Sequence, residues 1–253
     1  MTSATIEREG KTYRFALNHP IDLSTGIEAG PRSVRCFFAP PVEFQPVVQG
    51  SFIGDTTRGG AVNFKNIRLN PHGNGTHTEC LGHISREPHS INQCLKQYWF
   101  FATLLSAYPT KTEDGDRVVF RQSLEGGLSE GLFCEAVVLR TLPNPPEKKY
   151  LDHSGTNPPY LHWEAVSWLV ERGCQHLLVD LPSLEREEDG GKLQAHKAFW
   201  QYPDNPRLSA TVTELIYVPP AIPDGLYLLN LQVAPLELDA SPSRPVLYPM
   251  LQP

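Results

Sequence analysis

The sequence predicts an α/β fold built on a mixed, partly parallel sheet with few helices. A strand–helix–strand pattern runs from about residue 134 to residue 180, and the later segments 212–218 and 226–236 return to strand-like patterning. A crossover that contains a helix connects strands lying parallel in one sheet, so the first pattern indicates a parallel pair. The C-terminal segments add further strands and no long helix, which favours a mixed sheet.

Each element of this pattern has its own signal. Residues 117–120 and 134–140 are predicted as strands, the second buried on both faces because its centre is continuously apolar. The helix that follows has apolar residues at helical spacing and a glycine where its C-terminal cap is expected, namely Leu161, Ala165, Val166, Leu169, Val170 and Gly173. Residues 176–180 form a short strand with Asp180 at its carboxyl end, where we expect this carboxylate to hold the turn or orient a histidine.

Length and composition are those of an ordinary globular protein, and we expect a single domain over residues 1–253. The formal net charge of −6 argues against non-specific nucleic-acid binding, which depends on clustered Lys and Arg. No apolar run approaches the roughly 20 residues that a membrane span requires. The N-terminal residues lack the apolar segment of a signal peptide, so we expect a cytoplasmic protein without a membrane partner.

The five cysteines predict neither a disulfide framework nor a structural zinc knot, because they are odd in number, scattered and without a CxxC pair. Cys80 directly follows Glu79 and is therefore considered as a soft metal ligand or a nucleophile. Strand alternation turns it away from His77 and Glu79, which favours a packing role.

Residues 72–83 contain the candidate metal-binding and catalytic side chains, with three histidines, one carboxylate and three glycines. His77 and Glu79 are two positions apart, so in an extended segment their side chains lie on the same side. Imidazole and carboxylate together suit a transition metal such as zinc or manganese. We therefore predict a metal-dependent enzyme, against the alternative that these histidines cap turns or lie on the surface.

The run Gly75-Thr76-His77-Thr78-Glu79, followed by His83, resembles the signature of the cyclase-type metal-dependent hydrolases, which include bacterial kynurenine formamidase and isatin hydrolase. Further segments resemble other landmarks of this family in the same order: Ile21-Asp22-Leu23-Ser24, residues 177–183, Ala195-His196-Lys197, Glu214-Leu215 and Ser241-Pro242-Ser243-Arg244-Pro245. The resemblance covers most of the chain. It implies a swivelling β/β/α architecture and a homodimer or larger homo-oligomer.

The resemblance also implies the roles of individual residues. The metal ligands would be His77, Glu79, His196 and Glu214, and the bound metal would polarise a substrate carbonyl and activate a water as the nucleophile. His83 occupies the position of the general acid/base, which takes a proton from the water and returns it to the leaving amine. The implied reaction is hydrolysis of a C–N bond in a small substrate such as an aryl formamide or a cyclic amide.

Two positions depart from the family signature. Gly73 stands where the family has its first metal histidine, and Glu79 stands in place of an aspartate. His72 is one residue out of register, and such a slip in an extended segment turns a side chain to the opposite face. His72 can therefore join the metal ligands only if the loop bulges. The alternatives are a degenerate relative that binds a small molecule or serves as a scaffold without metal, and metal-free catalysis by Cys80 with His77 or His83.

Overall fold

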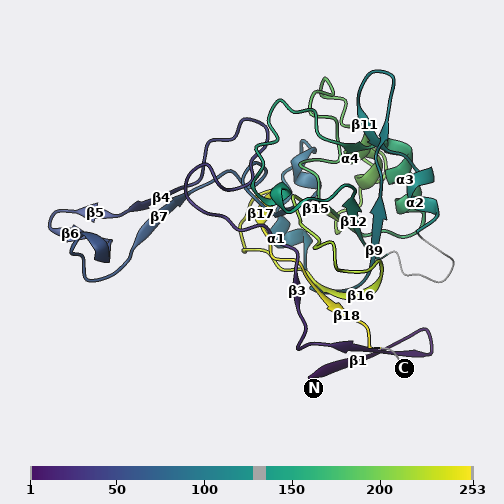
Figure 1. Cartoon of the computed structure of the whole chain (residues 1–253), viewed down its shortest axis with the longest axis horizontal. Helices are drawn as coiled ribbons and strands as arrows, with labels where there is room; N and C mark the ends of the chain where they lie inside the picture. Colours follow the sequence, from purple (N-terminus) through teal and green to yellow (C-terminus); the bar gives the residue numbers. More distant parts are fainter. Residues whose placement is uncertain (1, 128–134, 252–253) are drawn as a thin grey trace.

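A curled nine-stranded sheet forms the centre of the computed structural model, which describes residues 2–127 and 135–251 (Figure 1). The order of its strands is β17 (Ala240–Pro242), β8 (His77–Glu79), β15 (Thr211–Glu214), β14 (His176–Val179), β12 (Ala136–Thr141), β9 (Trp99–Ala107), β16 (Gly225–Asn230), β18 (Val246–Pro249) and β3 (Ile21–Asp22). The neighbours β15, β14, β12 and β9 run parallel, and the outer pairs run antiparallel. The predicted mixed, partly parallel sheet with few helices is confirmed, with more strand and less helix than an α/β class suggests.

The predicted crossover is present as β12, α3 (Trp163–Glu171) and β14, with β12 and β14 parallel. Val137 and Leu139 pack on the side of α3, whereas Ala136 and Val138 face a second core on the other side of the sheet. Both faces of the central strands are therefore buried, as their continuous apolar sequence predicts. Cys134, at the start of the predicted strand, lies outside the described residues.

The other helices are short: α1 (Ile91–Cys94), α2 (Gln122–Glu125), α4 (Gln194–Trp200) and the 3₁₀ turns η1 (Thr56–Arg58), η2 (Leu81–His83) and η3 (Pro146–Tyr150). Four small sheets lie outside the central one in the described residues. Two of them form the arm described below, and the other two are the hairpin of β1 (Ser3–Arg8) and β2 (Lys11–Ala16) and the trio β10 (Thr110–Lys111), β11 (Arg117–Val119) and β13 (Tyr160–Leu161). Among the described residues, each helix falls short of the length and apolarity that crossing a bilayer demands.

Two C-terminal strands are shorter than the sequence pattern indicates. Strand β15 ends at Glu214 because Leu215 adopts a left-handed backbone conformation, with a φ of 56°, that a strand cannot continue. Strand β16 ends at Asn230, so much of the predicted segment 226–236 is irregular. Asp180 holds a turn, accepting hydrogen bonds from Thr141 and Lys148.

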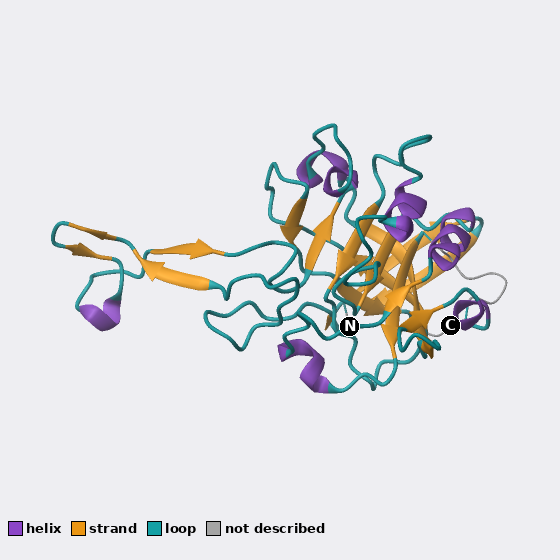
Figure 2. Ribbon diagram, turned by 90° about the horizontal axis from the view of Figure 1, so that it is seen from above, coloured by secondary structure: helices purple, strands orange, loops and turns teal. Residues whose placement is uncertain are grey.

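A narrow arm formed by residues 43–68 projects from the body (Figure 2). Its strands are β4 (Glu43–Pro46) paired with β7 (Lys65–Arg68), and β5 (Val48–Gln49) paired with β6 (Phe52–Ile53) near the tip. The last residue of β7 is only four positions before His72, so the arm leads directly into the loop that carries the first candidate ligand.

Candidate metal centre

Strand pairing places three of the candidate residues on one face of the sheet. His77 and Glu79 lie two residues apart on β8, and the antiparallel register sets Glu214 of β15 directly opposite His77. Side chains of directly opposed residues are neighbours on a sheet face. Thr78 points to the other face, where its hydroxyl meets that of Thr213 at 2.8 Å. The predicted alternation of β8 is confirmed.

The loop before β8 bulges and brings His72 to the same place. The Asn70 side chain accepts hydrogen bonds from the backbone N–H groups of both His72 and Gly73, which closes a tight turn. Gly73 packs so closely on Ala39 that a Cβ at position 73 would lie 2.3 Å from the Ala39 Cβ. A histidine does not fit at position 73 in this loop, whereas the side chain of His72 is free to turn toward Glu79.

Two more histidines come from short helical segments. His196 lies on α4, and Glu185 accepts hydrogen bonds from both its backbone N–H and its ring Nδ1, the latter at 3.1 Å. His83 ends the turn η2, which follows β8 after a single residue. The side chain of His83 is 31% exposed, whereas those of His77 and His196 are 0% and 2% exposed, so His83 faces the approach to the cluster.

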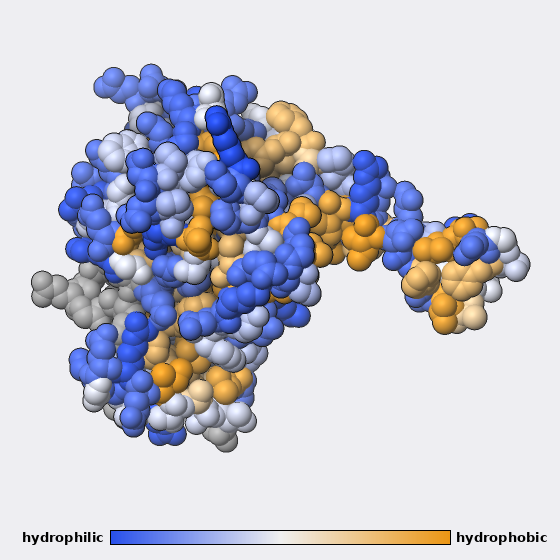
Figure 3. Space-filling view, turned by 180° about the vertical axis from the view of Figure 1, so that it is seen from behind, coloured by the Kyte–Doolittle hydropathy of each residue, from blue (hydrophilic) through white to orange (hydrophobic). Residues whose placement is uncertain are grey.

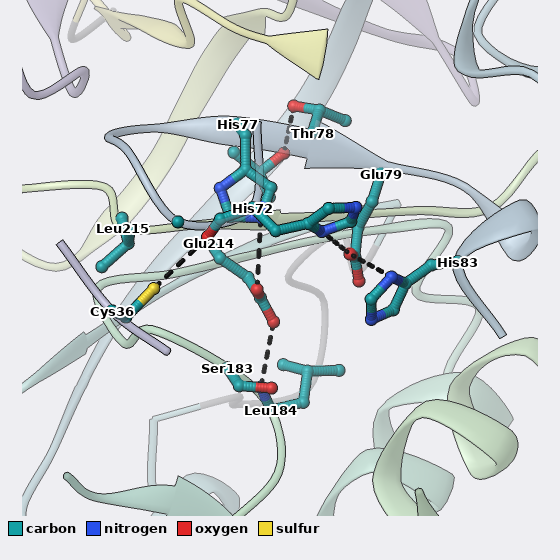
Figure 4. A network of polar contacts seen from close by, with 12 residues as sticks. Cys36, His72, His77, Thr78, Glu79, His83, Ser183, Leu184, Glu214 and Leu215 are labelled. Atoms are coloured by element: carbon teal, nitrogen blue, oxygen red, sulfur yellow. Dashed lines mark hydrogen bonds and ion pairs between the residues drawn. The ribbon is translucent and has the colours of Figure 1, made fainter. Parts of the chain in front are cut away.

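Glu79 and Glu214 lie at the middle of these imidazoles (Figure 4). The Glu79 carboxylate is 3.1 Å from His72 Nδ1, 3.2 Å from His196 Nε2 and 3.6 Å from His83 Nδ1. The Glu214 carboxylate is 3.3 Å from His77 Nε2 and 3.7 Å from His196 Nε2. All six candidate residues predicted from the sequence therefore meet at one point.

Several buried atoms at this point make no aligned hydrogen bond and have only the close nitrogen–oxygen contacts just described: His77 Nε2, both carboxylate oxygens of Glu79, and His196 Nε2. Buried polar atoms are costly to leave unpaired, and such a convergence is rare in proteins without a reason. Among the described residues, three overlapping sets place one ligand atom from each member within 4.8 Å of the others: His72, His77 and Glu79; Glu79, His83 and His196; and His72, His83 and Asp239. Nitrogen and carboxylate oxygen in this arrangement fit a transition-metal ion.

The carboxylates dominate the electrostatics of the cluster. Burial acts to raise the pKa of Glu79, but the imidazoles of His83, His196 and His72 outweigh it and hold that pKa well below its usual range. Burial acts to lower the pKa of His72, yet contacts with Asp239 and Glu79 raise it to about 10. The buried carboxylates thus favour a positive charge among them, and such a negatively charged environment suits a divalent cation.

Sequence reasoning missed two residues beside the cluster, Glu185 and Asp239. Asp239 lies 2.8 Å from His72 Nε2 and 3.5 Å from His83 Nδ1, and it directly precedes β17, which pairs with β8. Neither residue belongs to a local motif, so only the folded chain reveals them. Cys80, in contrast, is fully buried in the core on the other side of β8, and its contact with Cys94 and its burial raise its pKa, which opposes a role as nucleophile.

A groove of about 790 Å³ is lined by Asp239 and Gly82, whereas the six candidate residues are not among those that line it. Gly82 directly precedes His83 and Asp239 lies 3.5 Å from His83 Nδ1, and Arg86, His89 and Leu238 also line the groove. Its volume suits a small molecule.

The comparisons with known proteins agree with this geometry. The family described as Putative cyclase matches residues 15–186, which contain the His72 loop, β8 and His83. His196, Glu214 and Asp239 lie beyond the matched residues, so their place in the cluster rests on the structure alone. No curated protein is significantly similar to the chain in sequence.

Several solved structures share the fold. Isatin hydrolase A from Labrenzia aggregata superposes with a TM-score of 0.65 and 14% identity, over 91% of this chain and 93% of that one. A predicted metal-dependent hydrolase from Bacillus stearothermophilus gives 0.59 and 16%, over 91% and 98%. Isatin hydrolase A from Ralstonia solanacearum gives 0.61 and 13%, over 92% of each chain. At such low identity these structures establish the fold, while the site must be argued from its own residues.

Proposed function

Since the chain belongs to the family described as Putative cyclase, we propose that it is a metal-dependent hydrolase that cleaves the C–N bond of a small amide. The proposed ligands of the metal are His72, His77, Glu79, His196 and Glu214. Zinc and manganese are the proposed ions, because both accept mixed nitrogen and carboxylate ligands.

One observation carries the proposal: the way in which the buried imidazoles are held. His77 Nδ1 lies 3.1 Å from the Gly75 carbonyl and His196 Nδ1 lies 3.1 Å from Glu185, whereas the Nε2 atom of each ring faces the carboxylates of the cluster. Metal-binding histidines typically donate one ring N–H to an oxygen outside the site and present the other nitrogen to the ion. A purely structural cluster has no need for inner nitrogens that lack an aligned hydrogen bond.

When bound, the metal supplies a Lewis acid that polarises the amide carbonyl and makes water a better nucleophile. The chain's own residues supply the proton transfers. His83 lies at the exposed edge of the cluster, where its imidazole takes a proton from the attacking water and returns it to the leaving nitrogen. The carboxylates of Glu79 and Asp239 flank its Nδ1 atom at 3.6 and 3.5 Å and hold the ring at this edge.

The groove beside His83 supports a small substrate. It offers apolar surface at Leu238 and Pro88 together with polar groups at Arg86 and His89. We propose a planar substrate such as an aryl formamide or a cyclic amide, whose ring lies in the groove and whose carbonyl reaches the cluster.

Elemental analysis of protein purified without chelator tests this function. We expect stoichiometric zinc or manganese, or recovery of stoichiometric binding on equilibrium with either ion, and metal-dependent hydrolysis within a panel of aryl formamides and cyclic amides. Binding of neither ion, together with binding of these amides without turnover, would instead support a degenerate relative that holds small molecules.

The arm supports the further proposal that the protein forms a homodimer or larger homo-oligomer. The arm exposes apolar side chains, and Figure 3 shows orange atoms gathered on it: the exposed apolar residues are Phe44, Val48, Phe52, Val62, Phe64 and Ile67. A two-stranded ribbon is marginally stable alone and has open edges. The arm carries three basic residues (Arg58, Lys65, Arg68) and two acidic ones (Glu43, Asp55), whereas the chain as a whole has a net charge of −6. The arm's net charge of +1 is thus opposite in sign to that of the chain, which supports contact between the arm and the body of a second copy.

Changing the aromatic pair at the tip tests this assembly. Phe52 and Phe64 touch edge to face, with ring centroids 6.2 Å apart. We expect Phe52→Asp with Phe64→Asp to weaken self-association at least about 100-fold, since burying each ring contributes roughly 1.5–3 kcal/mol. Sedimentation velocity measures the change, and Tyr108→Ser, which alters an exposed aromatic of the body, is the control. A monomeric wild type, or an unchanged oligomer in the double variant, would rule out an assembly held by the arm.

A further inference from the structure

Asp239 and His72 form a pair that none of the sequence motifs contains. His72 Nε2 lies 2.8 Å from the Asp239 carboxylate, a short distance for a charge-assisted hydrogen bond. The other ring nitrogen, Nδ1, lies 3.1 Å from Glu79 and thus faces the centre of the cluster. With its two nitrogens directed to two different carboxylates, the ring has a defined orientation.

The backbone fixes Asp239 at this place. Its carbonyl accepts a hydrogen bond from the N–H of Cys80 at 3.0 Å, and the next residue, Ala240, pairs with Glu79 at the start of β17. The strand that carries Glu79 thus also positions the carboxylate that holds His72. The Asp239 side chain is free to act on His72 because the strand contacts use only backbone atoms.

We propose that Asp239 is a positioning residue that makes the out-of-register His72 a metal ligand. Its carboxylate accepts the Nε2–H of His72, which fixes the tautomer with an unprotonated Nδ1 and turns that nitrogen toward Glu79 and His77. The Asp239 carboxylate thereby serves His72 as Glu185 serves His196. The pair replaces the ligand that Gly73 cannot supply, and this inference rests on the proposed metal site.

Zinc affinity of the full chain, measured by competition with a chromophoric chelator, tests the role of Asp239. We expect Asp239→Ala to weaken zinc binding about 10- to 100-fold, the usual effect of removing a carboxylate behind a metal histidine. Asp239→Asn keeps a hydrogen-bond acceptor and is expected to fall between alanine and wild type. Glu237→Ala is the matched control, because Glu237 belongs to the same loop and its carboxylate contacts Ser90, Asn92 and Gln93, which lie outside the cluster.

A second measurement separates positioning from simple loss of charge. In the zinc-loaded wild type, ¹⁵N NMR of the histidine side chains should show His72 protonated at Nε2 and metal-bound at Nδ1, and Asp239→Ala should abolish this state while His196 keeps its own. In a His72→Ala background, Asp239→Ala should weaken zinc binding less than about twofold, since its effect passes through His72.

The possible failures are distinguishable. A wild type that binds no zinc would overturn both the proposed function and this inference. A wild type that binds zinc, with Asp239→Ala binding as tightly or with His72 bound through Nε2, would overturn the role of Asp239 alone. An equal loss with and without His72 would show that Asp239 acts on the site by another route and would also overturn it.

Discussion

Replacing His83 by alanine is expected to lower turnover by about 10²- to 10⁴-fold, the usual contribution of a general acid/base, while zinc binding stays close to that of the wild type. The reason is geometric. His83 is the most exposed imidazole of the cluster, and its Nδ1 lies farther from Glu79, at 3.6 Å, than the nitrogens of His72 and His196. Its loss removes the proton carrier and leaves the inner ligands in place.

Turnover and metal content must be measured on the same preparation, because only their divergence identifies the role. His19→Ala is a suitable control, since His19 is exposed near the N-terminus and contacts Asn18. If His83→Ala loses metal in proportion to activity, His83 is a ligand. Unchanged hydrolysis in that variant would remove it from the mechanism.

The second large effect is expected at Glu79. Glu79→Gln keeps the shape of the side chain but removes the charge that lies within 3.6 Å of three imidazoles. We expect zinc affinity to fall more than about 100-fold, beyond the usual loss for a residue that only supports a ligand. Hydrolysis should disappear with the metal.

Circular dichroism and chelator competition together distinguish this effect from unfolding. Glu164→Gln, on the exposed start of α3, provides a control of the same chemistry. Glu79→Asp is an informative companion, because aspartate is the residue at the corresponding position of the family signature. A Glu79→Gln protein that is folded and binds zinc as tightly as wild type would contradict the ligand role.

The central part of the fold was predictable because its signals are local. The apolar run of β12, the helical spacing of α3 and the short strand β14 each follow from neighbouring residues, and a crossover joins them in one way. The end of β15 was not predictable, since the left-handed conformation of Leu215 has no signature in its sequence. The arm was not predicted either. Phenylalanines in strands usually indicate a buried hairpin, whereas those of the arm are exposed.

The residues of the candidate site also fall into those that local sequence predicts and those that only the folded chain brings together. Strand alternation predicts that His77 and Glu79 share a face, whereas the approach of His196 and Glu214 depends on contacts between distant elements and was indicated only by the family resemblance. Asp239 and Glu185 had no signal of either kind. Residues of this sort act through neighbours that the fold brings together, so a single sequence does not reveal them.

The contact between Gly73 and Ala39 also limits which residues position 73 can accept. A histidine at position 73 would force its Cβ into the Ala39 methyl group. A single substitution at this position therefore does not produce the family signature. A histidine at position 73 would need the loop and the segment around Ala39 to change together. Any redesign of this site must therefore begin with the packing against residue 39 and only then exchange the ligand.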